Sequence, residues 1–256
     1  MRNDLWNRNQ LILALNLYWK TPYNKISGSS NEEIKELAPI IGKSPAAVAF
    51  MLMNFTALDK ERQDELKKGK RPPGKLAIEL WTEYLGKWEE LTNDSITILE
   101  NTSKEATSKF FKTDWEFKNT EGVDKERFVK TRVNQGEFRR RILASYNEKC
   151  CITNIDIPSL LTASHIIPWS RNKQERLNPR NGLCLNSIHD KAFDKGLITI
   201  TNDYTVKLSD SILAKKKDIS IQKYFLAYQN QKILLPDRFI PSIEFLEYHQ
   251  NNIFNQ

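Results

Sequence analysis

The chain has 256 residues, of which 39% are hydrophobic and 28% are charged, and its formal net charge is +7. This composition can build an apolar core, but it excludes a membrane-spanning protein because no apolar run approaches the roughly 18 residues that a spanning helix needs. The three cysteines contain no C-x-x-C pair, so they give no sign of a four-thiolate zinc site and make a poor disulfide framework. The first residues contain no signal-peptide core, and we expect a cytoplasmic protein of one large or two ordinary domains.

The first 92 residues are predicted to form a helical domain. Hydrophobic patterning predicts helices over residues 5–20, 31–42, 45–55 and 75–91. Thr21 and Pro22 should close the first helix, Asn31 and Ser44 are typical helix caps, and Gly42 is typical of a helix end. These signals predict compact helices joined by short turns.

The second and third predicted helices form a helix-turn-helix candidate, because they are short and are joined by a tight turn that contains glycine. The apolar spacing needed to pack them together is present at Ala38, Ile41, Val48 and Leu52. In this interpretation the later helix would lie near DNA and would help to select the target. Its sequence, PAAVAFMLMNF, offers few side chains that read base edges, so a purely structural helical hairpin is at least as good an interpretation.

Residues 93–125 are rich in Thr, Ser, Asn and Lys, which predicts a linker. A second domain should then span residues 126–256, opening with a helix over 133–150 and continuing with a strand that contains His165. A turn around Asn181, another apolar strand and a short helix from His189 should follow. A β-hairpin is predicted around Asn202 and Asp203, with a helical tail after it. The expected fold class is therefore α+β.

The positive charge is unevenly distributed along the chain. Residues 1–125 contain 19 Lys and Arg against 19 Asp and Glu, whereas residues 126–256 contain 20 against 13. A basic surface favours a polyanionic partner, because binding releases counterions and opposite charges attract over distance. This distribution favours DNA as the partner, although ordinary solubility charge explains it equally well.

The most informative stretch of the chain is residues 163–200, which hold two of the three histidines. His165 lies on the predicted strand, Asn181 in the turn, and His189 at the start of the short helix. Neutral imidazole can take a proton from water near neutral pH, and a bound divalent cation can stabilise a phosphodiester transition state. This order of residues on strand, turn and helix is typical of a one-metal nuclease.

Three motifs carry a family resemblance: SHIIPW at 164–169, RLNPRNGLCL at 176–185 and HDKAFDKGLITI at 189–200. They resemble the HNH (ββα-metal) nucleases, in the restriction-type branch with HIxPW, NPxNGLxL and HDxAFDxG, over roughly residues 134–254. The resemblance implies that His165 is the general base, that Asn181 holds the loop and orients the histidine, and that His189 binds the metal. It also implies one divalent ion, Mg²⁺ or Mn²⁺, with Zn²⁺ or Ni²⁺ as alternatives.

The sequence departs from the family at Ser164, where many HNH nucleases carry a metal-binding Asp. A nearby carboxylate could replace it, and Asp194 is favoured over Asp190. On a helix, however, Asp194 lies about 140° round from His189, so the two do not clearly share a face. The residues predicted to contact DNA phosphates are Arg140, Arg141, Arg176, Arg180 and Lys191.

The predicted function is a metal-dependent DNA endonuclease of bacterial restriction or anti-phage type. The alternative is a catalytically inactive DNA-binding regulator that keeps the fold, which the serine at position 164 and the helix-turn-helix candidate both favour. The expected partner is DNA and not a membrane. A homodimer stays an open alternative.

Overall fold

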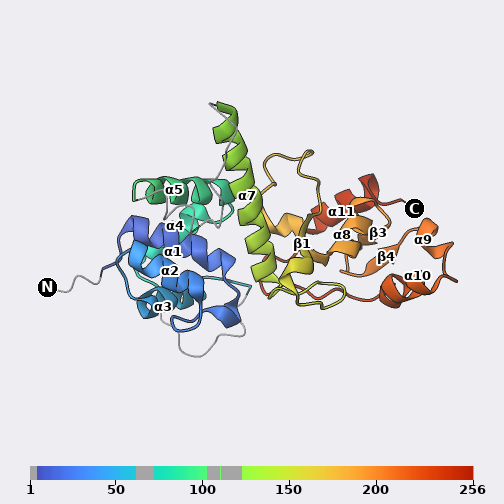
Figure 1. Ribbon diagram of the computed structural model, residues 1–256, viewed down its shortest axis with the longest axis horizontal. Helices are drawn as coiled ribbons and strands as arrows, with labels where there is room; N and C mark the ends of the chain where they lie inside the picture. Colours follow the sequence, from blue (N-terminus) through green and yellow to red (C-terminus); the bar gives the residue numbers. More distant parts are fainter. Residues whose placement is uncertain (1–4, 62–71, 103–109, 111–122, 256) are drawn as a thin grey trace. The chain divides into compact units, whose positions relative to one another are not determined.

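The computed structural model describes residues 5–61, 72–102, 110 and 123–255 (Figure 1). Over these residues it is rich in helices and contains two small antiparallel sheets, each of two strands. The predicted α+β class is confirmed. The chain divides into two compact units, Met1–Arg141 and Ile142–Gln256, which we call unit 1 and unit 2.

Unit 1 is organised around helix α1, which spans Arg8–Lys20 between an Asn7 cap and Thr21. Every residue from Leu11 to Lys20 is buried, as expected for a helix enclosed on all sides. The helices that pack against α1 are α2 (Glu32–Ile40), α3 (Pro45–Phe55), α4 (Lys75–Tyr84) and α5 (Trp88–Glu100). The helix predicted over residues 5–20 is confirmed, and it begins at Arg8.

Helices α2 and α3 begin at the predicted caps, because the side chains of Asn31 and Ser44 accept backbone N–H groups of the first turn. Their axes are bent by 108°, within the range of helix-turn-helix pairs. The four side chains predicted to pack them together are buried: Ala38, Ile41, Val48 and Leu52. The outward surface of α3 includes Phe50, which is 65% exposed, so this helix presents an aromatic ring where a DNA reader presents polar groups.

Among the described residues, no single helix is long and apolar enough to cross a bilayer. The bent α2–α3 pair reaches that length and composition only when its two helices are taken together.

Two predictions for residues 75–125 are wrong. The single helix predicted over 75–91 is broken, because Gly86 adopts a φ of +84° that side-chain-bearing residues rarely accept. Residues 93–100, assigned to a linker, belong to α5, whose Leu91 and Leu99 are buried in unit 1. Their polar composition reflects the outer face of a helix. Residues 103–109 and 111–122 of the predicted linker lie outside the described residues.

The boundary between the units falls inside helix α7, Val123–Ser145, and not at the predicted position between 125 and 126. A buried ionic cluster explains the difference. Glu137 accepts a hydrogen bond from Lys20 at 3.0 Å, and Arg141 lies 3.4 Å from the other carboxylate oxygen of Glu137. Because removing any partner would leave a buried charge uncompensated, this part of α7 is tied to unit 1.

Unit 2 begins with the end of α7 and contains two hairpins. Strand β1 (Leu161–His165) pairs with β2 (Gly182–Asn186), and helix α8 (Ser187–Asp194) packs on both strands. The second hairpin, β3 (Ile198–Ile200) with β4 (Val206–Leu208), confirms the turn predicted at Asn202 and Asp203. The remaining helices are α9 (Asp210–Leu213), α10 (Ile219–Tyr224) and α11 (Ile243–Asn252).

The third histidine holds α11 in the core of unit 2. His249 is 1% exposed, stacks on the ring of Phe193, and contacts the hydroxyl of Thr199 and the carbonyl of Phe193. Burial lowers the pKa of His249 to about 4, so the ring is neutral at physiological pH. This histidine is a structural residue.

Candidate active site

The strand pair β1–β2 sets where each candidate residue lies. His165, at the end of β1, is opposite Gly182, whereas Leu161, at the start of β1, is opposite Asn186. Four residues of strand separate these two levels, or about 13 Å. Helix α8 begins directly after Asn186, at the end of the hairpin that is remote from His165.

His165 is held by the long connection between β1 and β2. Its Nε2 lies 2.9 Å from the carbonyl oxygen of Arg176, and its ring meets the ring of Trp169 edge-on at 5.4 Å. A carbonyl oxygen can only accept, so Nε2 carries the proton and Nδ1 carries the lone pair of the neutral ring. Burial, as the largest effect, lowers the pKa of His165 below 6.5. The ring is therefore an oriented neutral base.

The same connection is fastened by Asn181, which is 1% exposed. Its Oδ1 accepts the backbone N–H of Ile167 at 2.7 Å, and its Nδ2 donates to the carbonyls of Ile167 and Glu175 at 3.2 Å. These bonds tie the two ends of the connection together, next to the Arg176 carbonyl that holds His165. The contacts of Asn181 are those of a positioning residue.

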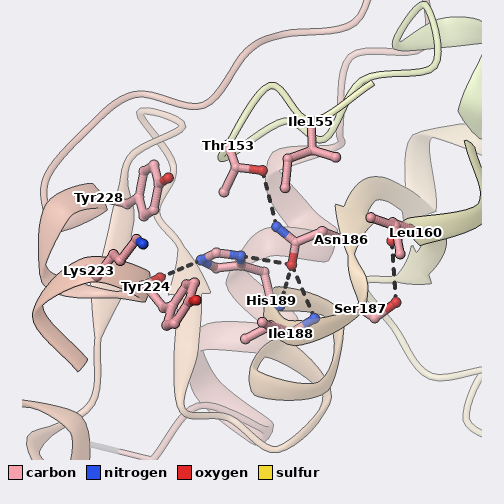
Figure 2. Close-up of a pocket in the computed structure, with 10 residues that line it drawn as sticks. All are labelled: Thr153, Ile155, Leu160, Asn186, Ser187, Ile188, His189, Lys223, Tyr224 and Tyr228. Carbon is pink, nitrogen blue, oxygen red and sulfur yellow. Dashed lines mark hydrogen bonds between the residues drawn. The ribbon is translucent and has the colours of Figure 1, made fainter. Parts of the chain in front are cut away.

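His189 lies in the first turn of α8, with its ring in a different environment from that of His165. Its Nδ1 is 3.1 Å from Oδ1 of Asn186, and its Nε2 is 2.9 Å from the carbonyl oxygen of Tyr224 (Figure 2). Since each ring nitrogen faces an oxygen of the fold, a metal ion at either nitrogen would have to displace that oxygen. Burial also lowers the pKa of His189.

The contacts that hold the two imidazoles differ, and a site shared by both rings stays a prediction. The residues that contact the His165 ring, Arg176 and Trp169, are not among those that contact the His189 ring. Asn186, the cap of α8, is paired with Leu161, four residues before His165. Asp190, the residue after His189, lies near Ser164 of β1.

The residue of α8 that reaches the His165 end is Asp190. The buried Ser164 hydroxyl makes no hydrogen bond of ordinary geometry among the described residues, yet it lies close enough to lower the pKa of Asp190. Burial is the larger effect and raises this pKa, and the nearby carboxylate of Asp194 raises it further. Asp190 and Asp194 are four residues apart and share one face of the helix. Asp190 therefore lies beside Ser164, and the carboxylate of Asp194 is close enough to Asp190 for a cation to relieve their repulsion.

Within the described residues, no group of three or more His, Cys, Asp or Glu side chains is arranged to hold a metal ion. A pair of carboxylates is nevertheless enough for Mg²⁺, which keeps several waters and commonly takes one or two carboxylates with substrate phosphate oxygens. The pair Asp190 and Asp194 fits such an ion in chemistry and in number of ligands.

The predicted phosphate contacts divide by position. Arg141 is completely buried in unit 1, with its guanidinium bonded to Thr92 and paired with Glu137, so the prediction that it binds DNA is wrong. Arg140 is paired with Glu33 at 2.7 Å and with Glu137 at 3.4 Å, and it belongs to the same structural cluster. Both were misassigned because an arginine-rich run was interpreted as a surface.

The other three predicted contacts lie in unit 2. Arg176 donates from Nε to the carbonyl of Trp169 and lies over the Trp169 ring, so this side chain braces the loop around His165. Arg180 is exposed and donates to the carbonyl of Ile240, and Lys191 is exposed on α8. Their contacts with DNA stay predictions.

Three residues of the site were not predicted from the sequence: Asn186, Trp169 and Tyr224. Asn186 carried a usable signal, because an asparagine before a short helix with Asp in its first turn is typical of a cap. Trp169 is half-buried against His165. Tyr224 acts through its backbone carbonyl, which leaves no mark in the sequence.

Residues 150–201, which include β1, β2, α8 and β3, match the family model described as HNH endonuclease. This match supports the HNH family for this part of the chain, and with it nuclease activity at the level of the family and DNA as the substrate. No curated protein matches the chain.

Proposed function

We propose that unit 2 is a metal-dependent endonuclease that hydrolyses phosphodiester bonds of DNA, with His165 as the general base. The observation that carries the proposal is the held tautomer of His165, in which the Arg176 carbonyl takes the Nε2 proton and leaves the basic lone pair on Nδ1. This ring stands at the end of β1, next to the serine that adjoins the Asp190 carboxylate. The residue range that matches the HNH family supports the same reaction.

The chain's own groups divide the work as follows. The Nδ1 of His165 accepts the proton of the attacking water, and the bond from Nε2 to the Arg176 carbonyl steadies the imidazolium that results. Asn181 holds the connection that carries this carbonyl, and Trp169 limits movement of the ring. Lys191 and Arg180 are exposed cations of the same unit that could contact phosphates.

Asp190 and Asp194 are the residues that would hold the divalent ion, and His189 is not proposed as a ligand. A bound Mg²⁺ or Mn²⁺ would polarise the phosphate and stabilise the charge of the leaving oxygen. Carboxylate ligands favour these ions over Zn²⁺ or Ni²⁺, which suit imidazole better. Restriction or defence against foreign DNA is our proposal for the biological role, and the α2–α3 pair is the element proposed to select the target.

The decisive experiment is cleavage of supercoiled plasmid by His165→Ala in Mg²⁺ or Mn²⁺. We expect the rate to fall at least about 100-fold, because a positioned general base contributes on the order of 10² to 10⁴. In the unaltered protein, the neutral ring is the active form, so cleavage should fall only as the pH drops below the ordinary imidazole value of 6.5.

Fluorescence anisotropy with labelled duplex in EDTA is the control, and His165→Ala should bind as the unaltered protein does. Nicking by the variant at the unaltered rate would contradict the proposal. Salt-sensitive binding without cleavage by the unaltered protein, in any divalent ion, would instead favour the inactive DNA-binding regulator.

A further inference from the structure

A cavity of about 270 Å³ opens beside the first turn of α8, and the cleavage chemistry does not use it (Figure 2). Two tyrosine rings, Tyr224 and Tyr228, lie on one side, and the aliphatic side chains of Ile155, Leu160 and Ile188 lie around the rest. The ring of Tyr228 stands edge-on to the His189 ring at 5.5 Å. A cavity of this size is slightly smaller than typical small-ligand pockets and suits a single ring system.

The apolar lining is exposed to an unusual degree. Ile155, Leu160, Ile188 and Tyr224 are between 36% and 51% exposed, although all four line the same cavity. Adjoining apolar side chains that stay exposed mark a surface that binds something. The ligand must offer an apolar face to the pocket.

The surroundings of the pocket are basic. Lys215, Lys216 and Lys217 are exposed just before α10, and Lys223 lines the cavity itself. Residues 210–232 contain five lysines and only two acidic residues. A second copy of the chain on this surface would bring like-charged lysines together, whereas a nucleic-acid strand would be attracted. Aromatic rings inside a basic surface are the means by which proteins hold unstacked bases.

From these observations, and resting on the proposed function, we propose that the pocket takes one unstacked nucleobase of the DNA strand that unit 2 binds. The base would stack on Tyr224 or Tyr228 while the lysines contact the flanking phosphates. His189, which lines the pocket, and Asp190, which faces Ser164, are consecutive residues of α8. One helix therefore carries both the pocket and a residue proposed for cleavage.

The test is binding in EDTA, where cleavage plays no part. Three fluorescein-labelled probes are compared by anisotropy: a paired 20-base-pair duplex, the same duplex with one unpaired adenine, and the single strand. For the unpaired and single-stranded probes we expect Tyr224→Ala and Tyr228→Ala to weaken binding about 5- to 150-fold, as for the loss of one base–aromatic stack. For the paired duplex, the affinity of the alanine variants should stay within about twofold of that of the unaltered protein.

Tyr224→Phe keeps the ring and should keep the affinity, and Leu235→Ala removes an equally exposed apolar side chain that does not line the cavity. Circular dichroism melting checks that each variant folds. Unchanged affinity of both alanine variants for the unpaired and single-stranded probes would contradict the base-binding pocket. A changed sedimentation coefficient with unchanged DNA affinity would also overturn it, because the surface would then be an interface between copies.

The two proposals fail separately. If tighter binding of the unpaired and single-stranded probes depends on the tyrosines but the protein cleaves no plasmid, only the cleavage proposal is contradicted. If cleavage depends on His165 but the tyrosine variants bind DNA as the unaltered protein does, only the proposal of a base-binding pocket is contradicted.

Discussion

At the scale of single residues, the chemistry depends on which atoms the fold leaves available. The three histidines have similar intrinsic chemistry, yet burial lowers the pKa of each and each takes different partners. His165 is held by one carbonyl at the end of a strand, His189 lies between two oxygens in a pocket, and His249 is stacked in the core. The contacts of His165 support our proposal that it is the general base.

The revised metal ligands give a prediction at this scale. Asp190→Asn and Asp194→Asn should each weaken Mn²⁺ binding at least about tenfold, because each removes a charged oxygen from a pair that repels itself when empty. Isothermal titration with Mn²⁺ alone measures this without reference to activity. The matched control is Glu244→Gln, which alters an exposed carboxylate of α11. Unchanged Mn²⁺ affinity in both aspartate variants would exclude this site.

At the scale of elements, α8 decides the geometry of the site. Its Asn186 cap sets the start of the helix at the far end of the hairpin, so one turn later Asp190 reaches Ser164. The helix ends at Asp194, and Gly196, two residues later, has a φ of +65° and packs closely on the carbonyl of Ile253 after α11. The length and position of α8 are therefore set at both ends by tertiary contacts.

Two glycine substitutions test whether the close approach of Gly196 to Ile253 stabilises unit 2. In Gly196→Ala the new Cβ would lie 2.0 Å from the Ile253 carbonyl oxygen, which cannot be accommodated without moving α11 or α8. In Gly86→Ala the Cβ would meet nothing within 4 Å, so only the positive φ is penalised, at about 1 kcal/mol. We expect urea denaturation to show a loss for Gly196→Ala at least about twice that of Gly86→Ala. Equal losses would show that the close approach of the two segments does not stabilise unit 2.

At the scale of the whole molecule, the positive charge is less concentrated around the site than the sequence indicated. Residues 142–256 contain 14 Lys and Arg against 11 Asp and Glu, and residues 126–141 contain six against two. Part of that second group is the buried cluster of Arg140 and Arg141, which neutralises carboxylates of unit 1. The charge available to DNA in unit 2 lies on exposed side chains such as Lys191 and Lys215–Lys217.

The salt dependence of DNA binding measures this charge. Replacing Lys215, Lys216 and Lys217 together by Gln should reduce the slope of log K against log salt by about 2 to 3, since each phosphate contact contributes roughly 0.9. Lys75→Gln removes an exposed lysine from α4 in unit 1 and should leave the slope unchanged. A triple variant with the slope of the unaltered protein would show that these lysines do not contact phosphates.

The amino-acid sequence by itself determined the local features of the protein. Asn31 and Ser44 predicted where two helices begin, and the apolar pattern predicted α1. The strand–turn–strand–helix order around His165 and Asn181 predicted the hairpin and α8. These features depend on interactions between residues that are close in the chain, so they are visible without coordinates.

Only the tertiary structure decided which of those residues meet. The register of β1 and β2, with the cap at Asn186, gave the two histidines different partners and brought Asp190 to Ser164. Burial of Arg141 against Thr92 removed an expected DNA contact, and the carbonyl of Tyr224 came to lie against His189. Such contacts join segments tens of residues apart, and they depend on how whole elements pack, which no local pattern of side chains specifies.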